Sequence, residues 1–289
     1  MVVKQKILVT GANGQLGKEL HRLSANFLVF DFIFLSREDL QIHEPESVKQ
    51  VFQKYAPQYC INCAAYTAVD KAETDQDAAF LVNGEATGVL AAVCKEYNTR
   101  FIHISTDYVF DGNGTAPYTV DAATNPQSVY GASKLRGENK AIAANAASVI
   151  IRTSWVYSSF GKNFVKTMLR LMSEKKEINV VNDQVGSPTY AGDLARAILD
   201  IISSGNWHPG IYHFSNKGVI SWYDFAVAIK ELSGSSCTVH PIPSSAYPTP
   251  ARRPSYSVMD TSRISDVYGI ELSGWKVSLT ECLALLKEQ

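Results

Sequence analysis

The sequence lacks the features that mark secreted and nucleic-acid-binding proteins. Its 289 residues include only five cysteines, an odd count spread along the chain. That excludes a disulfide framework and favours a reducing, cytoplasmic compartment. Charge of neither sign is in excess, since 27 Lys and Arg against 28 Asp and Glu leave a net charge of −1. We therefore expect no nucleic-acid partner.

Long hydrophobic runs are also missing. The longest, residues 27–35, contains Asp31 and is far shorter than the roughly 20 residues that span a membrane, so we expect no membrane partner. The chain starts directly in a strand pattern, without the layout of a signal peptide. The remaining composition, 46% hydrophobic and 19% charged, is that of a globular protein, and the length predicts about two domains.

The first half of the chain alternates short β-branched runs with amphipathic stretches. Strands are predicted at 6–10, 28–35, 58–63, 100–105 and 148–152, and helices at 14–24, 45–55, 75–97 and 130–144. This alternation predicts an α/β fold, a Rossmann-type doubly wound parallel sheet with helices on both faces.

The pattern changes after Tyr157. Helices are predicted at 163–173, 193–203, 222–232 and 279–287, with short strands at 178–181 and 211–214 and an extended proline-rich connection at 241–254. We expect residues 1–157 to form a nucleotide-binding domain. Residues 158–289 are expected to form mainly a smaller mixed α/β substrate-binding domain, with some segments packing back on the first.

A glycine-rich turn follows the first strand. Gly11, Gly14 and Gly17 have the spacing G-x-x-G-x-x-G between a predicted strand and helix. Glycine lets the backbone approach a ligand closely, and the helix N-terminus presents free amides to a diphosphate. In this context the turn predicts dinucleotide binding.

The end of the second strand indicates which dinucleotide. Ser36 and Arg37 follow that strand, where a hydroxyl and a guanidinium suit the 2′-phosphate of NADPH. Glu38 and Asp39 come next, so NADH remains possible as a second cofactor.

Three residues suggest carbonyl chemistry. Tyr130 and Lys134 are four positions apart in a predicted helix and share a face. We expect the ammonium to lower the pKa of the phenol and make it a proton donor or acceptor for a carbonyl or carbinol. Thr106 follows a central strand and is expected to hydrogen-bond the carbonyl oxygen.

These motifs resemble the extended short-chain dehydrogenase/reductase family. Within it, the chain is most similar to the reductases that act on dTDP-4-dehydro-L-rhamnose. The segments that carry the likeness extend over nearly the whole chain: 11–17, 62–65, 65–73, 105–110, 130–134, 152–157, 163–164, 182–189 and 247–254.

The resemblance implies reduction of the C4 keto group of a dTDP-sugar by NADPH. Tyr130 would protonate the alkoxide, Lys134 would hold the nicotinamide ribose, and Thr106 would orient the carbonyl. The family assigns the cofactor to the glycine turn and the loop after the third strand, and the sugar to residues near Thr106. Matching positions are Gly14, Gln15, Leu16, Ala65, Tyr66 and Thr67 for the cofactor, and Thr106, Asp107 and Trp155 for the sugar.

Arg252 and Arg253 lie in the proline-rich segment. Guanidinium groups match diphosphate oxygens, so both are expected to bind the sugar nucleotide. The alternative is a surface pair that makes ion pairs with Asp or Glu.

Other functions stay open. Related dehydratases have Glu where this chain has Tyr108, which favours simple reduction, but another sugar-nucleotide reductase or an epimerase would use the same Thr–Tyr–Lys group. The regulatory subunit of methionine adenosyltransferase resembles this family without catalysing reduction. The presence of Tyr130 and Lys134 argues against that reading, and the absence of a G-x-S-x-G elbow argues against a serine hydrolase.

No metal is expected. Some family members form magnesium-bridged dimers through acidic side chains. Glu19 matches one such position, but Gly192 stands where another is needed, with Asp193 next to it. We therefore expect a monomer or weak homodimer. Cys60 and Cys63 lie in a buried strand pattern without a second ligand pair, and His103 is expected to be a hydrogen-bonded core residue.

Overall fold

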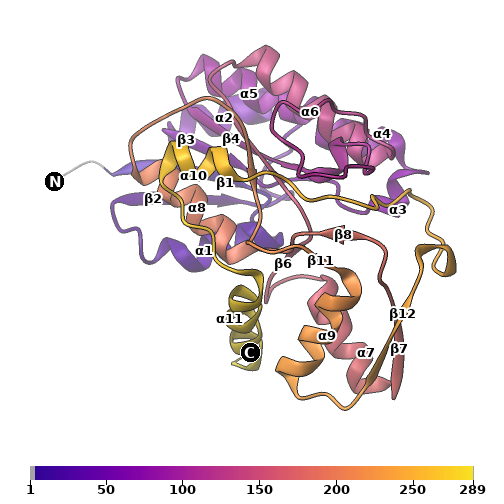
Figure 1. Ribbon diagram of the computed structural model, residues 1–289. Helices are drawn as coiled ribbons and strands as arrows, with labels where there is room; N and C mark the ends of the chain where they lie inside the picture. The colour runs from indigo at the N-terminus through magenta and orange to yellow at the C-terminus, as the bar shows by residue number, and fades with distance from the viewer. Residues whose placement is uncertain (1–3, 289) are drawn as a thin grey trace.

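The computed structural model describes residues 4–288 (Figure 1). Residues 1–3 and 289 lie outside the described residues. They are the outer ends of the two predicted domains.

A six-stranded parallel sheet forms the centre of the larger part of the molecule. Its order is β10-β5-β4-β3-β1-β2. The strands are β1 (Gln5–Thr10), β2 (Phe30–Leu35), β3 (Tyr59–Asn62), β4 (Arg100–Thr106), β5 (Val149–Thr153) and β10 (Gly210–Phe214). The chain leaves β1 for β2 on one side and returns to β3 on the other, so the sheet has its switch point between β1 and β3, where open α/β sheets bind ligands. The predicted doubly wound sheet is confirmed.

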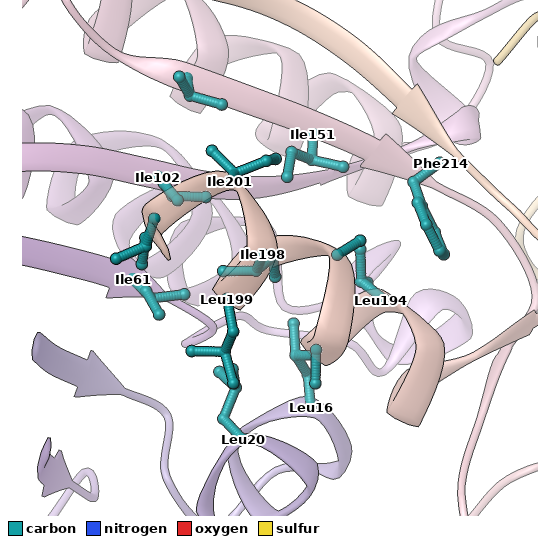
Figure 2. Packing of buried hydrophobic residues seen from close by; sticks show 14 of the residues in the cluster. Leu16, Leu20, Ile61, Ile102, Ile151, Leu194, Ile198, Leu199, Ile201 and Phe214 are labelled. Carbon is teal, nitrogen blue, oxygen red and sulfur yellow. The ribbon is translucent and has the colours of Figure 1, made fainter. Parts of the chain in front are cut away.

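Helices cover both faces of this sheet (Figure 1). One face carries α2 (Pro45–Tyr55), α5 (Ala86–Glu96) and α6 (Val129–Ala144), and the other α1 (Gln15–Ser24), α8 (Ala191–Ser203) and α10 (Ser262–Tyr268). Figure 2 shows how Leu16 and Leu20 of α1 meet Ile198 and Leu199 of α8 beneath the strands. This packing fixes the start of α1 relative to the ends of the strands.

The smaller part has its own hydrophobic core. It contains α7 (Phe164–Glu174), α9 (Trp222–Ser233) and α11 (Trp275–Lys287). Three short strand pairs accompany them: β7 (Glu177–Val181) with β12 (Thr238–Ile242), β8 (Val185–Gly186) with β11 (Ile220–Ser221), and β6 (Val156–Tyr157) with β9 (Thr189–Tyr190). Three elements after residue 157 belong with the large sheet: β10 is its edge strand, and α8 and α10 pack on one face. The division at 157 stays a prediction.

Three predicted elements differ most from the structure. The helix predicted at 75–97 is α4 (Gln76–Phe80), a π-helical turn η1 (Leu81–Glu85) and α5. The last helix begins at Trp275, four residues before the predicted start. The proline-rich connection begins inside β12 and contains the short helix η3 (Ser244–Ala246). Pro241 is accommodated because β12 is an edge strand of a two-stranded pair.

One stretch, 76–96, is long and apolar enough by length and composition alone to cross a membrane, but half of it is buried in the fold. It packs against α2 and α6, as the core helix of a globular protein does.

Candidate active site

The glycine turn connects β1 to α1 at the switch point of the sheet. Gly11 has a φ of +69°, and a Cβ there would lie 2.6 Å from the backbone nitrogen of Ala64. A Cβ at Gly17 would lie 2.5 Å from the Gly11 carbonyl oxygen. Only glycine fits both positions, so the turn lies tightly between the ends of β1 and β3.

The first amides of α1 have no side-chain cap. The residue before the helix is Gly14, which has no side chain to supply a capping oxygen. Free amides and the positive end of the helix dipole favour an anion at this place. The Gln15 side chain accepts a hydrogen bond from Asn163 at 2.9 Å, and Leu16 is buried in the core, which leaves its backbone for ligand contact.

Ser36 and Arg37 follow β2 as predicted, and the Ala12 amide donates to the Leu35 carbonyl at 3.2 Å, so they lie beside the glycine turn. The Ser36 hydroxyl is committed to Asp39, to which it donates at 2.7 Å. The hydrogen bonds from the side chain and the backbone of Ser36 lower the pKa of the Asp39 carboxyl group. Arg37 is exposed, and among residues 4–288 no ion pair holds its guanidinium. Arg37 is therefore the freer of the two predicted phosphate-binding side chains.

The loop after β3 is held by a residue that the sequence analysis missed. Asn83, in the π-helical turn η1, accepts from the Tyr66 amide at 2.8 Å and donates to the Tyr66 carbonyl at 3.1 Å. It also donates to Ser133 of α6 at 2.9 Å. Asn83 thus fixes Ala65, Tyr66 and Thr67 relative to the helix that carries Tyr130. A polar residue inside an otherwise apolar helical pattern was the available signal.

Thr106 and Tyr130 meet at the carboxyl end of β4. Ser128 caps α6 by accepting from the Gly131 amide at 3.1 Å, which starts the helix one residue before Tyr130. Burial raises the pKa of the Tyr130 phenol, and its side-chain interaction with Thr106 opposes this only in part. The expectation of a lowered phenol pKa is therefore wrong for this structure, because desolvation disfavours the phenolate.

Lys134 points beneath the site toward β4. Its ammonium donates to the Ile104 carbonyl at 2.6 Å, and its Nζ lies 3.3 Å from the Nε2 of His103. Burial lowers the pKa of Lys134 to about 8. The i, i+4 relation to Tyr130 is present as predicted.

Asp107 is the most unusual carboxyl group of the site. It is 3% exposed and accepts from the Thr106 hydroxyl at 3.0 Å, while its Oδ2 is buried with no partner among the described residues. Burial raises the pKa of Asp107 to about 7, and hydrogen bonds that include one with Ser257 oppose the shift. An unpartnered polar atom of this kind is suited to a ligand hydroxyl.

Trp155 has a strained backbone and a stacked ring. Its φ is +49°, in the left-handed region that bulky residues rarely adopt. The ring stacks on Trp222 of α9, with centroids 3.6 Å apart. A Cβ at Gly186 would lie within 2.7 Å of this ring and 2.5 Å of the Ser257 hydroxyl, so Trp155 lies next to the serine that contacts Asp107. Strain held by packing is typical of functional sites.

The two arginines of the proline-rich segment differ. Arg253 forms an ion pair with Asp70 at 2.6 Å and donates to the Tyr108 hydroxyl at 3.3 Å. The Tyr108 ring in turn contacts the edge of Tyr130. Arg252 is exposed and donates to Gln127 at 3.3 Å. The structure therefore brings Arg253 to the predicted catalytic residues, whereas Arg252 lies further out.

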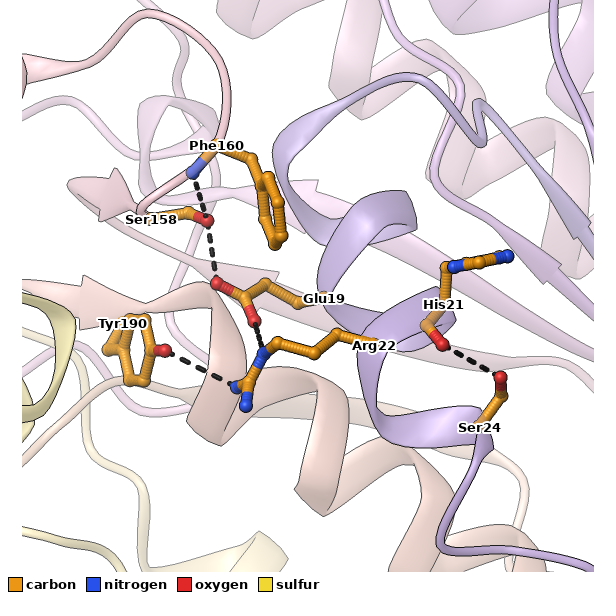
Figure 3. A network of polar contacts seen from close by, with 7 residues as sticks. All are labelled: Glu19, His21, Arg22, Ser24, Ser158, Phe160 and Tyr190. Carbon is orange, nitrogen blue, oxygen red and sulfur yellow. Dashed lines mark hydrogen bonds and ion pairs between the residues drawn. The ribbon is translucent and has the colours of Figure 1, made fainter. Parts of the chain in front are cut away.

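Glu19, the residue considered for a metal-bridged dimer, is engaged within the chain (Figure 3). Its two oxygens accept from Ser158 at 2.6 Å and from Arg22 at 2.9 Å. Asp193 accepts from Asn216 and Ser278. Within residues 4–288, no group of three or more His, Cys, Asp and Glu side chains is placed to hold a metal ion.

The two cysteines of the C-x-x-C sequence lie in β3 and just after it. Cys60 is a buried free thiol in β3. Burial raises the pKa of Cys63, so Cys63 is not a reactive thiolate at neutral pH. The contact of Trp222 with Trp155 was missed because 67 positions separate the two residues and no local pattern links them.

A Rossmann-type sheet, a phosphate-binding turn at its switch point and a Thr–Tyr–Lys group at the end of β4 define the class: an NAD(P)H-dependent oxidoreductase of the short-chain dehydrogenase/reductase type. The family model described as the RmlD substrate binding domain matches residues 5–288. The chain belongs to this family.

Relatives match the chain over almost its full length. The dTDP-4-dehydrorhamnose reductase of Burkholderia thailandensis is 41% identical over 98% of this chain and 100% of the relative. A crystal structure of such a reductase from Clostridium acetobutylicum has a TM-score of 0.93 at 43% identity, covering 98% of this chain and 100% of the other. The Bacillus anthracis enzyme, a complex with NADP, has a TM-score of 0.94 at 36% identity, with coverage of 98% and 100%.

Proposed function

We propose that the protein reduces the C4 keto group of dTDP-4-dehydro-L-rhamnose with NADPH and forms dTDP-L-rhamnose. The observation that carries this proposal is the placement of Thr106, Tyr130 and Lys134 at the carboxyl end of β4, next to the phosphate-binding turn. Full-length relatives that carry the name of this reductase support it. The exposed Arg37 is the reason for preferring NADPH, with NADH as a weaker alternative.

The proposed reaction needs a proton donor that stays protonated at neutral pH. Tyr130 meets this need because its burial raises the pKa of the phenol. NADPH supplies the hydride when it is bound. The alkoxide that forms on the sugar then takes the Tyr130 proton, while the Thr106 hydroxyl turns its hydrogen from Asp107 to the same oxygen. Lys134 holds the nicotinamide ribose, and its positive charge stabilises the phenolate left on Tyr130.

The cofactor residues follow from the turn and the loops beside it. The glycines 11, 14 and 17 and the uncapped start of α1 at Gln15 and Leu16 fit a diphosphate. Arg37, with Ser36 beside it, would bind the adenosine end, and Ala65, Tyr66 and Thr67 would line the nicotinamide side. The fit is supported by the close approach of Gly11 to Ala64, which no larger residue permits.

The sugar binds between Asp107 and Trp155 in this proposal. The free Oδ2 of Asp107 contacts a sugar hydroxyl, and the Trp155 ring, backed by Trp222, covers one face of the sugar. Arg253, with Arg252 further out, binds the diphosphate of the sugar nucleotide.

We further propose that the protein works in the cytoplasm as a monomer or weak homodimer without a required metal. The five free cysteines and the engagement of Glu19 within its own chain support this. Sedimentation with and without magnesium tests it: a tight dimer that appears only with magnesium would contradict the proposal.

The reaction is tested by the loss of NADPH absorbance with dTDP-4-dehydro-L-rhamnose, with NADH in parallel. We expect NADPH oxidation with formation of dTDP-L-rhamnose, identified by mass and by NMR of the sugar. The C5 epimer of the substrate is the matched control for sugar recognition and should react more slowly. Protein that binds NADPH but oxidises it with neither sugar would contradict this function.

A further inference from the structure

His103 is a fully buried titratable side chain that the proposed reaction does not use. It lies in β4, three residues before Thr106, with 0% exposure. Its Nδ1 lies 3.0 Å from the Nδ2 of Asn62, and its Nε2 lies 3.3 Å from the Nζ of Lys134. The imidazole therefore connects the end of β3 with the lysine of the active site.

The orientation of the Asn62 amide is fixed by its other contacts. The Ala64 amide donates to the Oδ1 of Asn62 at 3.2 Å, and the Thr10 hydroxyl donates to the same oxygen at 2.7 Å. A backbone amide can only donate, so the oxygen must face Ala64 and the NH₂ group must face His103. The three side chains are neighbours across the sheet, since Asn62 pairs with both Thr10 and His103 in the strand register.

This orientation decides where the imidazole carries its proton. The NH₂ group of Asn62 donates to Nδ1, so Nδ1 has to be the acceptor. Burial keeps the pKa of His103 well below its usual value, so the ring is neutral. A neutral ring with an accepting Nδ1 has its hydrogen on Nε2, which points at the Nζ of Lys134.

The Nε2–H bond of His103 points at Lys134 and interacts differently with the neutral amine and with the ammonium form of that side chain. A neutral amine has a lone pair and accepts this hydrogen bond, while an ammonium has only hydrogens to present. The Ile104 carbonyl accepts from Lys134 in either state. We propose that His103 is a positioning residue whose tautomer, fixed by Asn62, weakens proton binding by Lys134 and so sets the alkaline limit of the reductase.

The other groups that face Lys134 act in the opposite direction. Glu138, on α6 itself, and Cys63, after β3, both favour its charged form. The Glu138 carboxylate is shared with Arg152 at 2.7 Å and with Ser105, and Cys63 is a neutral thiol at neutral pH because burial raises its pKa. His103 is therefore the neighbour that acts with burial in favouring the neutral amine.

The tautomer is tested without any assay of activity. Protein labelled with ¹⁵N-histidine is studied by long-range ¹⁵N–¹H NMR, and the His103 signals are assigned by their loss in His103→Phe. We expect Nδ1 to have the shift of an unprotonated nitrogen and Nε2 that of a protonated one, unchanged from about pH 6 to about pH 9. A hydrogen on Nδ1, or titration within this range, would overturn the proposal whatever the protein catalyses.

The effect on Lys134 is tested by the pH dependence of kcat, which rests on the proposed function. Activity should fall where Lys134 loses its charge, near pH 8 in the unchanged protein. His103→Phe keeps an aromatic ring of similar shape but removes the Nε2 hydrogen. The alkaline decrease in kcat should therefore move up by about one pH unit. Asn62→Asp should move it the same way, because a carboxylate places the hydrogen on Nδ1 and turns the Nε2 lone pair to Lys134.

His213→Phe is the matched control, since His213 is also buried in the sheet but contacts the Asp260 carbonyl instead of Lys134. It should leave the alkaline decrease in kcat in place. If both test variants reduce the substrate with this decrease unshifted, the role of His103 is refuted while the proposed function stands. If His103→Phe fails to fold, the pH dependence of kcat in Asn62→Asp still decides.

Discussion

Arg253 and Asp70 are 183 positions apart in the chain and form an ion pair with 2.6 Å between the guanidinium nitrogen and the carboxylate oxygen. Asp70 lies in α3 (Val69–Ala72), and its other oxygen accepts from the Ala251 amide at 3.2 Å. One carboxylate thus holds both the backbone and a side chain of the proline-rich segment next to Tyr108. The arginine is oriented before any substrate arrives, which reduces the entropy lost on binding.

Arg253→Ala should weaken binding of the sugar nucleotide. Loss of a charge-assisted phosphate contact is expected to raise the KM for dTDP-4-dehydro-L-rhamnose about tenfold or more, with the NADPH dissociation constant unchanged. Arg252→Ala is the matched control and should have a smaller effect, because Arg252 is exposed and donates to Gln127 instead of to Tyr108. Equal effects of the two substitutions would refute the distinction between these arginines.

Tyr130→Phe should remove the proton donor but retain the ring that contacts Tyr108. Turnover is expected to fall by about 10²-fold or more, while NADPH binding, measured by fluorescence titration, stays nearly unchanged. Tyr55→Phe, at the end of α2 far from the site, is the control for loss of a tyrosine hydroxyl. Turnover within a few-fold of the unchanged protein would mean that another group donates the proton.

Arg37→Ala tests the choice of cofactor. The 2′-phosphate is the group that distinguishes NADPH from NADH, so a side chain that binds it affects only one of the two. We expect the KM for NADPH to rise several-fold more than the KM for NADH, in steady-state assays with saturating sugar nucleotide. An equal rise for both cofactors would show that Arg37 does not read the phosphate.

The sequence predicted the large sheet well because its strands and helices have local signals. The strands near 6–10 and 100–105 are rich in Ile, Leu, Val and Phe, and the glycine turn has a spacing that few other structures need. The Thr–Tyr–Lys group was predictable because Tyr130 and Lys134 lie in one helix. These features depend on residues close together in the chain.

The missed features depend on contacts between distant residues. The stack of Trp155 on Trp222, the engagement of Arg253 by Asp70 and the Asn62–His103–Lys134 chain each join segments that no local pattern relates. The pKa of Tyr130 was predicted in the wrong direction for a similar reason. The sequence shows the nearby lysine, but only the fold shows how strongly the phenol is desolvated.

Glu138→Gln should destabilise the protein strongly. The ion pair of Glu138 with Arg152 is almost fully buried, with side-chain exposures of 1% and 3%. Neutralising one partner leaves an uncompensated buried guanidinium, which costs about 3–5 kcal/mol. Glu174→Gln is the matched control, because its exposed pair with Arg170 is worth less than about 1 kcal/mol. Urea denaturation measures both, and similar losses would show that burial does not decide the cost.

Asp107→Asn should change how stability depends on pH. Burial raises the pKa of Asp107 to about 7 in the folded chain, above the value of about 4 in an unfolded chain. The stabilising contribution of this group is therefore fully present below about pH 4 and is lost as the pH rises through 7. The asparagine variant lacks this loss, so its free energy of unfolding should rise relative to that of the unchanged protein between about pH 4 and about pH 7, and the difference should stay constant above that range.

Asp111→Asn should change the pH dependence of the free energy of unfolding in the opposite direction. Hydrogen bonds from Tyr118 and Asn113 lower the pKa of Asp111, so its stabilising contribution is present at neutral pH and is lost as the pH falls through that lowered value. Its variant should be less stable than the unchanged protein at neutral pH, and the difference should vanish in acid. If the two variants deviate in the same direction at about pH 8, Asp107 is not a desolvated carboxyl group.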